Sequence, residues 1–234
     1  MTNLTHELRA QGYDLISGPV RDQKLLQLWI KKFLSDAQLA YTNLQNVFQG
    51  SAKLQAVEAP ALNVNSNLKD QYSFNLGISM LQEILHAIGL DSFDLSSVIQ
   101  SGRSLSISYQ DAFTQQIPIG QLQDFLSSAD FRYPNQVLLR EANRNDLLAV
   151  SGIMQAKKLL VSIQTNEQLS DSQAAEASKK GQGKLKCNLS GNYQLDMSYS
   201  GNAPFPIAVM ANRLCFDKGH FRKTELLTDR EHLF

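Results

Sequence analysis

The chain has 234 residues, of which 43% are apolar and 19% are charged. This length is enough for one large domain or two small ones with a hydrophobic core, and the composition excludes a highly charged disordered protein. The 22 basic residues balance the 22 acidic ones. Because no overall positive field would attract nucleic acid, we expect no nucleic-acid partner.

The two cysteines, Cys187 and Cys215, form neither a CxxC motif nor a paired-histidine spacing. A disulfide framework or a structural zinc site is therefore not expected. The first residues lack a basic-then-apolar signal pattern, and no apolar run approaches the roughly 18 residues that a membrane helix needs. These observations predict a cytoplasmic protein without a metal or other cofactor.

The spacing of apolar residues predicts short helices and strands in the first part of the chain. The clearest signal is Tyr72–Met80, where apolar residues alternate with Ser, Asn and Gly without a miss. In chain order the predicted elements are a helix over 2–10 ended by Gly12, a strand over 13–16, an amphipathic helix or strand over 24–34, a strand over 72–80, and helices over 80–89 and 92–99.

Alternating strands dominate the second part of the chain. The predicted elements are a strand over 104–113, a helix over 120–129, a turn at 133–135, a buried strand over 147–154, strands over 157–165, 184–193 and 193–199, a mobile loop over 166–183, a turn at 201–206, a strand over 205–216, and a helix around Leu226–Leu233. This order predicts an α+β fold, with one twisted, mostly antiparallel sheet and helices inserted between its strands.

Four of the predicted strands have the length that a bilayer-spanning β-strand needs, roughly 9–11 residues. Each has one apolar face and one face of Ser, Asn, Gln and Lys, which fits a barrel wall between lipid and water. The same pattern describes an ordinary sheet with one buried face. Insertion would require oligomerisation, because edge strands need partners in lipid.

The sequence contains no recognised catalytic motif: GxSxG, P-loop, HExxH and GxGxxG are all absent. The spacing of Cys215 and His220 leaves a nucleophile pair open, although their neighbours indicate a strand rather than an exposed turn. Acidic pairs such as Asp111 with Asp124 are typical of helix caps or solvated faces. We therefore expect no enzymatic activity and no catalytic residues.

Four segments, in this order, carry a family resemblance over about residues 4–221. They are Leu8–Leu15 (LRAQGYDL) with Pro19 and Leu25-Leu26, Ser104–Asp111 (SLSISYQD) with residues 122–129, Asp146–Lys158 (DLLAVSGIMQAKK), and Ala203–Leu214 (APFPIAVMANRL). Together they resemble the gasdermins, most closely the short bacterial type. The resemblance implies a fold like the gasdermin N-terminal domain.

This resemblance also implies a pore-forming domain over residues 1–213 and an autoinhibitory tail over residues 214–234. A protease, caspase-like by analogy with the family, would remove the tail. The monomer would then oligomerise in the inner cell membrane into a β-barrel pore that kills the cell, as a defence against phage. Residues 81–99 and 166–183 would refold into spanning strand and tip, giving hairpins 72–80 with 104–113 and 157–165 with 184–193.

The resemblance assigns roles to particular residues. The cleavage region is Leu214, Cys215, Phe216, Asp217, Lys218, Gly219, His220, Phe221, Arg222 and Lys223. The apolar contacts of the tail are Leu226, Leu227, Leu233 and Phe234. The lipid-facing strand residues are Tyr72, Phe74, Leu76, Ile78, Leu105, Ile107, Tyr109, Leu159, Val161, Ile163, Leu185, Cys187 and Leu189. The residues expected at lipid headgroups are Arg9, Lys24, Lys31, Lys32, Lys157 and Lys158.

One departure from the family pattern concerns the N-terminus. Bacterial relatives often carry a lipidated cysteine within the first few residues, where this chain has Thr2, Asn3 and Leu4. We therefore expect no lipidation. Two other hypotheses stay open: a non-enzymatic α+β module that binds a lipid or a protein without inserting, and a cysteine-dependent enzyme.

Overall fold

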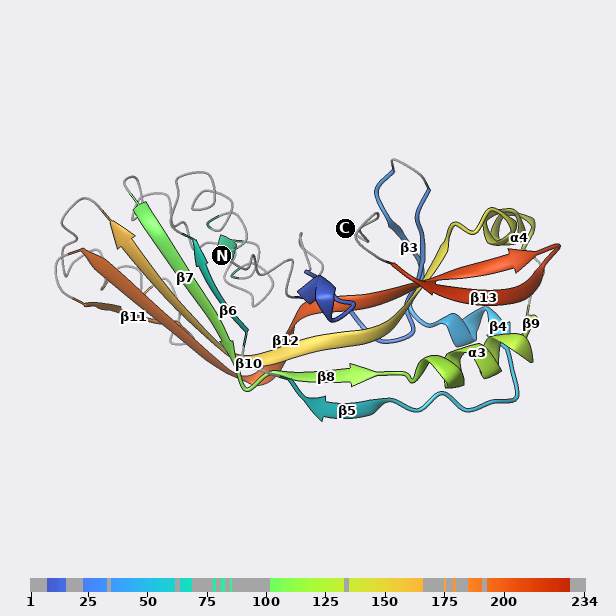
Figure 1. Ribbon diagram of the computed structural model, residues 1–234, viewed down its shortest axis with the longest axis horizontal. Coiled ribbons are helices and arrows are strands. Elements are labelled where there is room, and N and C mark those ends of the chain that lie inside the picture. The colour runs from blue at the N-terminus through green and yellow to red at the C-terminus, as the bar shows by residue number, and fades with distance from the viewer. Residues whose placement is uncertain are drawn as a thin grey trace.

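The computed structural model of the chain describes residues 8–15, 23–32, 35–61, 64–68, 102–132, 135–165, 185–190 and 193–227, together with residues 78, 81, 82, 85, 175 and 179. Two long antiparallel strands, β10 (Leu147–Thr165) and β12 (Gln194–Asp217), run side by side through the molecule and carry the other strands of the main sheet (Figure 1).

The shorter strands pair with different stretches of these two. Along β10 lie β2 (Leu28–Ile30), β8 (Phe113–Gln116) and β7 (Gly102–Gln110). Along β12 lie β1 (Asp14–Leu15), β11 (Leu185–Leu189) and β13 (His220–Leu226). Outside these, β3 (Gln38–Tyr41) pairs with β2, β5 (Val57–Pro60) with β8, and β6 (Val64–Leu68) with β7.

A bend divides the sheet into two arms (Figure 1). The strand arm consists of β6, β7, β11, residues 158–165 of β10 and residues 194–200 of β12. The helix arm holds the remaining halves of β10 and β12, with α3 (Ile119–Ser127), α4 (Gln136–Asn143), the short helix η1 (Leu44–Asn46), the small sheet of β4 (Phe48–Gln49) and β9 (Asp130–Phe131), and β13.

The bend corrects the predicted turn at 201–206, because β12 is one continuous strand there. Ala156 pairs with Phe205 and Lys158 with Ser200, so residues 201–204 of β12 stand opposite a single residue of β10. Such an insertion bends a strand without ending it. Gly201 and Pro204 suit this place, since proline cannot donate to a ladder and glycine tolerates irregular backbone. The predicted strands 147–154 and 157–165 likewise form one strand, β10.

Two further predictions are wrong where the structure describes them. Leu226, predicted at the start of a helix, ends strand β13 and pairs with Asn212. Ile78, predicted in the strand 72–80, has helical backbone, whereas residues 72–77, 79 and 80 of that predicted strand lie outside the described residues. Helix α4 was not predicted at all, although Asn135 caps it by accepting from Val137 N at 2.9 Å.

Other predicted elements are confirmed. Leu8 to Ala10 are helical and end at Gly12, whose φ is +81°. Strands β1 and β11 lie within their predicted ranges, α3 begins one residue before its predicted range, and β7 begins two residues before its range and ends at Gln110, ahead of Asp111 with its φ of +52°. Leu81, Gln82 and Leu85 are helical as predicted. The amphipathic segment 24–34 contains strand β2. Ala175 and Lys179, in the predicted loop, have helical backbone, and the predicted helix 92–99 and residues 228–234 lie outside the described residues.

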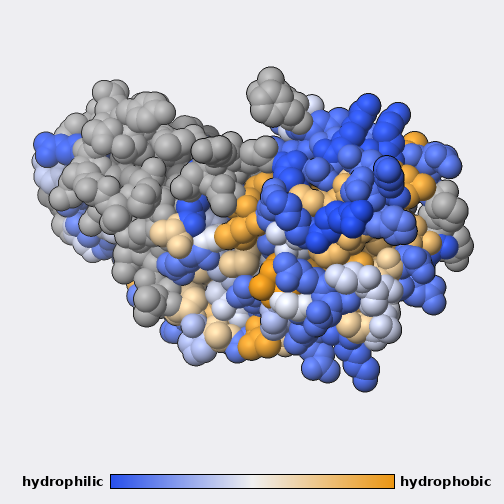
Figure 2. Space-filling view, turned by 45° about the vertical axis from the view of Figure 1, so that its right-hand side comes forward, coloured by the Kyte–Doolittle hydropathy of each residue, from blue (hydrophilic) through white to orange (hydrophobic). Residues whose placement is uncertain are grey.

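Each arm has its own buried core. In the helix arm, apolar residues of α3 and α4 pack with Leu147 and Leu214 of the two long strands and with Phe48. On the face seen in Figure 2, this arm has a mostly hydrophilic surface with hydrophobic residues in small separate groups. The core of the strand arm lies on one side of its sheet, and its geometry is the basis of the candidate site. No helix among the described residues is both long and apolar enough to span a membrane.

Candidate functional site

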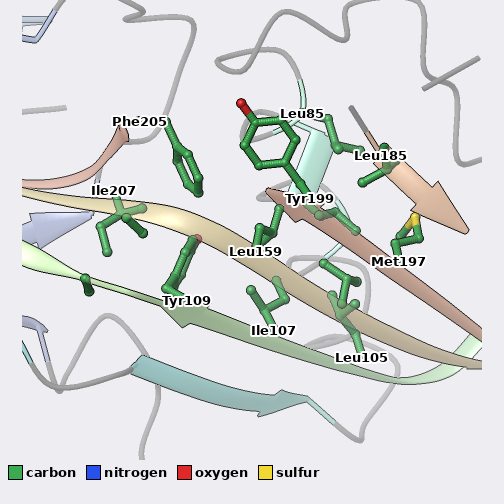
Figure 3. Packing of buried hydrophobic residues seen from close by; sticks show 14 of the residues in the cluster. Leu85, Leu105, Ile107, Tyr109, Leu159, Leu185, Met197, Tyr199, Phe205 and Ile207 are labelled. Carbon is green, nitrogen blue, oxygen red and sulfur yellow. The ribbon is translucent and has the colours of Figure 1, made fainter. Parts of the chain in front are cut away.

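The strand arm carries rows of apolar side chains that cross four strands. Nearest the bend, the register aligns Tyr109 of β7, Leu159 of β10, Tyr199 of β12 and Leu185 of β11. The next row is Ile107, Val161, Met197 and Cys187, and the third is Leu105, Ile163, Leu195 and Leu189. Figure 3 shows many of these residues projecting from the sheet to the same side. The rows form because successive side chains of a strand point to opposite faces.

The opposite face of the same strands is polar. Its rows include Ser108 beside Leu160 and Ser198, and Ser106 beside Ser162 and Asp196. These residues are exposed or half-buried, and Ser104 Oγ donates to Gln164 Oε1 at 3.1 Å. The strand arm therefore has the two-faced character that the alternation predicted, with Leu160 as the apolar exception, 36% exposed.

A helical segment covers the apolar face. Ile78, Leu81 and Leu85 belong to the same cluster as the three rows, and Leu81 and Leu85 are at most 1% exposed. Figure 3 shows Leu85 over the face that carries Tyr199 and Leu185. The face is therefore a buried core, and it would become available to another apolar partner if this segment moved away.

The C-terminal strand β13 folds back on β12 through a two-residue turn. Lys218 and Gly219 have φ values of +51° and +80°, the geometry of a tight hairpin turn whose twist matches that of the flanking strands. Asp217 pairs with His220 across it. Glycine adopts this conformation without strain, which explains why the hairpin turns at this dipeptide.

Three hydrogen bonds connect this hairpin to the corner between α4 and β10. Asn143 Oδ1 accepts from Gly219 N at 2.7 Å, and Asn145 Oδ1 accepts from Phe216 N at 2.9 Å. The Asn145 carbonyl oxygen accepts from Arg213 Nη1 at 2.6 Å. Asn145 has a φ of +60°, which asparagine tolerates better than most residues. These contacts fix the hairpin, within the helix arm, to the corner between α4 and β10.

Apolar and polar contacts continue along β13. Phe216 and Phe221 pack edge-on with centroids 5.8 Å apart, and Gln123 Nε2 of α3 donates to Thr224 Oγ1 at 3.0 Å. Leu227 is buried in a cluster with Trp29, and its backbone N donates to the Ala211 carbonyl at 3.0 Å. The end of the described chain is thus packed into the fold.

Comparisons with known proteins agree on one family. A sequence profile of the Bacterial Gasdermin Family matches residues 16–220, which is most of the chain. The chain belongs to the bacterial gasdermin family. Gasdermins are pore-forming proteins that act in cell death, and the family is not an enzyme family.

Two curated gasdermins align over nearly the whole chain. One, from a Desulfuromonadales bacterium, is 22% identical over 227 residues, covering 94% of this chain and 84% of its own length. Another, from Gillisia limnaea strain DSM 15749, is 23% identical over 222 residues, covering 92% and 82%. The solved structure of a bacterial gasdermin from Bradyrhizobium tropiciagri has a TM-score of 0.65 at 16% identity and covers 97% of this chain and 92% of that one. It confirms the gasdermin fold.

The predicted headgroup residues of this gasdermin lie in three parts of the fold. Arg9 precedes β1 and its Nε lies 3.2 Å from Asp14 Oδ1. Lys24, Lys31 and Lys32 flank β2, and Lys32 Nζ lies 3.5 Å from Glu141 Oε1. At the bend, Lys157 Nζ lies over the Phe113 ring and Lys158 pairs with Asp111 at 2.9 Å. Their role at a membrane stays a prediction.

The tail residues of the gasdermin differ in burial. Leu214, Cys215 and Phe216 are buried in β12, whereas Asp217, Lys218 and His220 at the turn are exposed. Leu226 is 41% exposed, although it lies against Gly12, where a β-carbon would come within 3.2 Å of its Cδ2. Leu233 and Phe234 lie outside the described residues. The exposed part of the predicted cleavage region is therefore the turn and the outer side of β13.

The structure does not join Cys215 to His220. Cys215 pairs with Lys223 and His220 with Asp217. Burial, and secondarily the nearby Glu225, raises the pKa of the Cys215 thiol, which makes it a poor nucleophile at neutral pH. Within the described ranges no group of three or more His, Cys, Asp or Glu side chains is placed to hold a metal ion.

Sequence reasoning missed the polar residues that fix the hairpin, Asn143, Asn145 and Arg213. The run Asn143-Arg144-Asn145-Asp146 between α4 and β10 has the composition of a turn, which could have pointed to a corner. Their partners lie about 70 residues away, at a distance that local patterns do not reveal.

Proposed function

We propose that this gasdermin is an autoinhibited pore former whose strand arm enters the bilayer after residues 214–234 are removed. The observation that carries the proposal is the register of the strand arm, which aligns three apolar rows on one face and Ser, Asn, Gln and Lys on the other. A membrane barrel needs such a wall, with an apolar face toward lipid and a polar face toward water.

In the resting monomer the apolar face is covered by the segment of Ile78, Leu81 and Leu85. On activation this segment, within residues 72–99, and residues 166–183 refold and lengthen the strands into the hairpins that span the bilayer. The lipid-facing residues are then those predicted from the alternation, among them Tyr109, Val161 and Ile163. The free energy of transfer that burial now supplies comes instead from contact with acyl chains.

A single monomer cannot close this wall. In the described sheet β6 pairs with β7 and β11 with β12, so the strand arm ends in edge strands on both sides. Unpaired backbone groups are costly in lipid, and neighbouring monomers in a ring would pair them. The active form is therefore a homo-oligomer, and the inactive form a monomer.

The tail, residues 214–234, keeps the protein in the resting form. β13 contributes a ladder with β12, Gly219 N of its turn donates to Asn143 Oδ1 at the α4–β10 corner, and Leu227 is buried. As a tethered strand it acts at a high effective concentration, which cleavage abolishes. Leu226, Leu233 and Phe234 are further apolar contacts of this tail.

The activating cut falls within Leu214–Lys223, and the exposed turn at Lys218-Gly219 is its accessible part. A caspase-like protease of the host cell makes the cut. The basic residues Arg9, Lys24, Lys31, Lys32, Lys157 and Lys158 then attract anionic headgroups, each by about 1 kcal/mol near the surface. The protein moves from the cytoplasm to the inner cell membrane, and the pore kills the infected cell as a defence against phage.

Dye release from vesicles tests this proposal. A recognition sequence for a site-specific protease is inserted between Lys218 and Gly219, and vesicles of phosphatidylcholine and phosphatidylglycerol report leakage. We expect dye release only after the cut, together with ring-shaped oligomers in the membrane. The matched control carries the same insertion beside the exposed Ala56; cutting there leaves the tail attached and releases no dye. A cut chain that stays monomeric and releases nothing contradicts the proposal.

A further inference from the structure

Within the described part of the chain, the hydroxyl group of one tyrosine of the strand arm is buried without a hydrogen-bond partner. Tyr109 is fully buried, and its hydroxyl has no hydrogen-bond partner among the residues that the structure describes. Its ring packs on Phe205, with centroids 6.4 Å apart, and Phe205 packs edge-on against Tyr199 at 5.6 Å. A hydroxyl that has lost water without gaining a partner destabilises the fold that holds it.

The tyrosines occupy a definite place on the apolar face. Tyr109 and Tyr199 belong to the row nearest the bend. On β7, β10, β12 and β11 the two rows farther out contain only aliphatic and sulfur-bearing side chains, and β6 adds Ser66 opposite Ile107 in the register. On the other side of the tyrosine row, at the bend, the exposed Lys157 holds its Nζ 5.7 Å from the centre of the Phe113 ring. On these four strands the tyrosine row is therefore more polar than the rows of Ile107 and Leu105, and the buried cluster continues from the tyrosines into the bend through Phe205 and Ile207.

We propose that the row of Tyr109 and Tyr199 contacts the lipid headgroups and interfacial water, while the rows of Ile107 and Leu105 contact acyl chains. This inference rests on the proposed function, because it needs the apolar face to meet lipid. The inference specifies how deep each row of the sheet lies in the bilayer. The bend lies at the water interface from which the strands enter the membrane.

The chemistry of tyrosine supports this placement. Its ring is apolar and its hydroxyl is polar, so tyrosines gather in belts at membrane interfaces. There the Tyr109 hydroxyl gains the partners that the resting fold denies it, and Lys157 lies beside anionic headgroups. Leu105 is four residues beyond Tyr109, about 13 Å along the strand, and about 10 Å deeper once the usual tilt of barrel strands is included.

The end of the apolar face farthest from the bend supports a competing placement, in which that end lies at the entry interface. The exposed Arg103 lies two residues before Leu105, at the outer end of β7, and an arginine also suits a headgroup. If that end lay at the entry interface instead, Leu105 would be shallow and Tyr109 deep. The order of the two depths therefore decides between the placements.

Depth-dependent fluorescence quenching measures this order. Tyr109→Trp and Leu105→Trp are made separately in a Trp29→Phe background of the chain that carries the inserted protease site. After cleavage, vesicles contain lipids brominated either near the glycerol end or near the methyl end of the acyl chain. We expect the first probe to be quenched more by the shallow bromines and the second more by the deep ones. Tyr199→Trp and Ile163→Trp are the second pair of probes for the same rows.

The outcomes separate this inference from the proposed function. Dye release with equal or reversed depths overturns the placement and leaves pore formation intact. No dye release and no quenching of either probe overturns both. Tyr109→Phe adds a test without any bulky residue: removal of the unpartnered hydroxyl should raise the melting temperature of the uncut chain by about 2–4 °C. An unchanged or lower melting temperature would show that the hydroxyl is satisfied in the resting fold, against the inference.

Discussion

The side-chain oxygen Oδ1 of Asn145 accepts a hydrogen bond from the backbone N of Phe216 at 2.9 Å, although the two residues are 71 positions apart in the chain. Asn145 stands in the left-handed region, with a φ of +60°, between the end of α4 and the start of β10. This bond ties β12, the first strand of the C-terminal hairpin, to the corner between α4 and β10. The hairpin is therefore stabilised by a hydrogen bond to another part of the fold, in addition to the ladder between β12 and β13.

Asn145→Ala should destabilise the chain by about 2–5 kcal/mol. The left-handed backbone costs alanine about 1–2 kcal/mol, and the half-buried Phe216 N loses its partner at a cost of about 1–3 kcal/mol. Urea unfolding measures the change, and hydrogen exchange should show faster exchange in β13 before the rest of the sheet. Asn145→Gly is the matched control. It removes the same side-chain acceptor but tolerates the φ value, so only the cost of the lost hydrogen bond, about 1–3 kcal/mol, is expected. An equal loss in both variants would refute the role of the backbone conformation.

Leu227 and Leu226 are neighbours with opposite surroundings, and their alanine variants should differ. Leu227 is 8% exposed and packs in the cluster of Trp29, whereas Leu226 is 41% exposed. We expect Leu227→Ala to cost about 2–3 kcal/mol and Leu226→Ala less than about 1 kcal/mol, measured by thermal unfolding.

The same pair tests the autoinhibition by the tail. Leu227→Ser should cause dye release from vesicles without any protease, and Leu226→Ser should cause much less. If both serine variants leave vesicles intact while Leu227→Ser is measurably less stable, the tail stabilises the fold but does not restrain pore formation.

Gly152 lies where β10 crosses Tyr13, and there is no room for a side chain. A β-carbon at Gly152 would come within 3.1 Å of both Met210 Cβ and Tyr13 Oη. Gly152→Ala should therefore destabilise the chain by about 1–3 kcal/mol. Gly120→Ala is the control, because nothing lies within 4 Å of its β-carbon in α3. There we expect a gain of about 0.5–1 kcal/mol from the higher helix propensity of alanine, and a similar loss at both sites would contradict the crowding argument.

Cys215 should report the release of β13. In the intact chain its thiol is buried, and burial raises its pKa. Because the thiolate is the reacting form, alkylation at pH 8 should be much slower than in the urea-unfolded chain and should accelerate only at more alkaline pH. In a Cys187→Ala background, cleavage at the inserted site should increase the rate as β13 leaves. A fast reaction in the intact chain would instead revive the hypothesis of a cysteine-dependent enzyme.

Much of the strand arm could be predicted from local pattern. The alternation around Leu105 and Val161 assigns those residues to one face because the side-chain period of a strand is two, and the structure buries them. The resemblance of four segments predicted the family. What the alternation does not contain is register, so the alignment of Tyr109, Leu159 and Tyr199 in one row became visible only in the folded chain.

The hairpin shows where local signals fail. The sequence pattern around Leu226 predicts a helix, yet Leu226 is the last residue of strand β13. The reason is that the edge of β12 supplies backbone hydrogen-bond partners, which a local pattern does not represent. Likewise, Gly201 and Pro204 are residues typical of a turn. Because β12 pairs with β10 both before and after them, β12 stays continuous and the inserted residues produce a bend instead.

The sequence by itself determined the two-faced strands, the absence of a recognised catalytic motif and the membership in the gasdermin family, since these depend on residue types and their spacing along the chain. Only the tertiary structure decided which strands share a row, what covers the apolar face, and how Asn143 and Asn145 hold a hairpin about 70 residues away. The reason is physical: pairing, burial and hydrogen bonding between distant segments depend on which surfaces meet when the whole chain packs, and no short stretch of sequence contains that information.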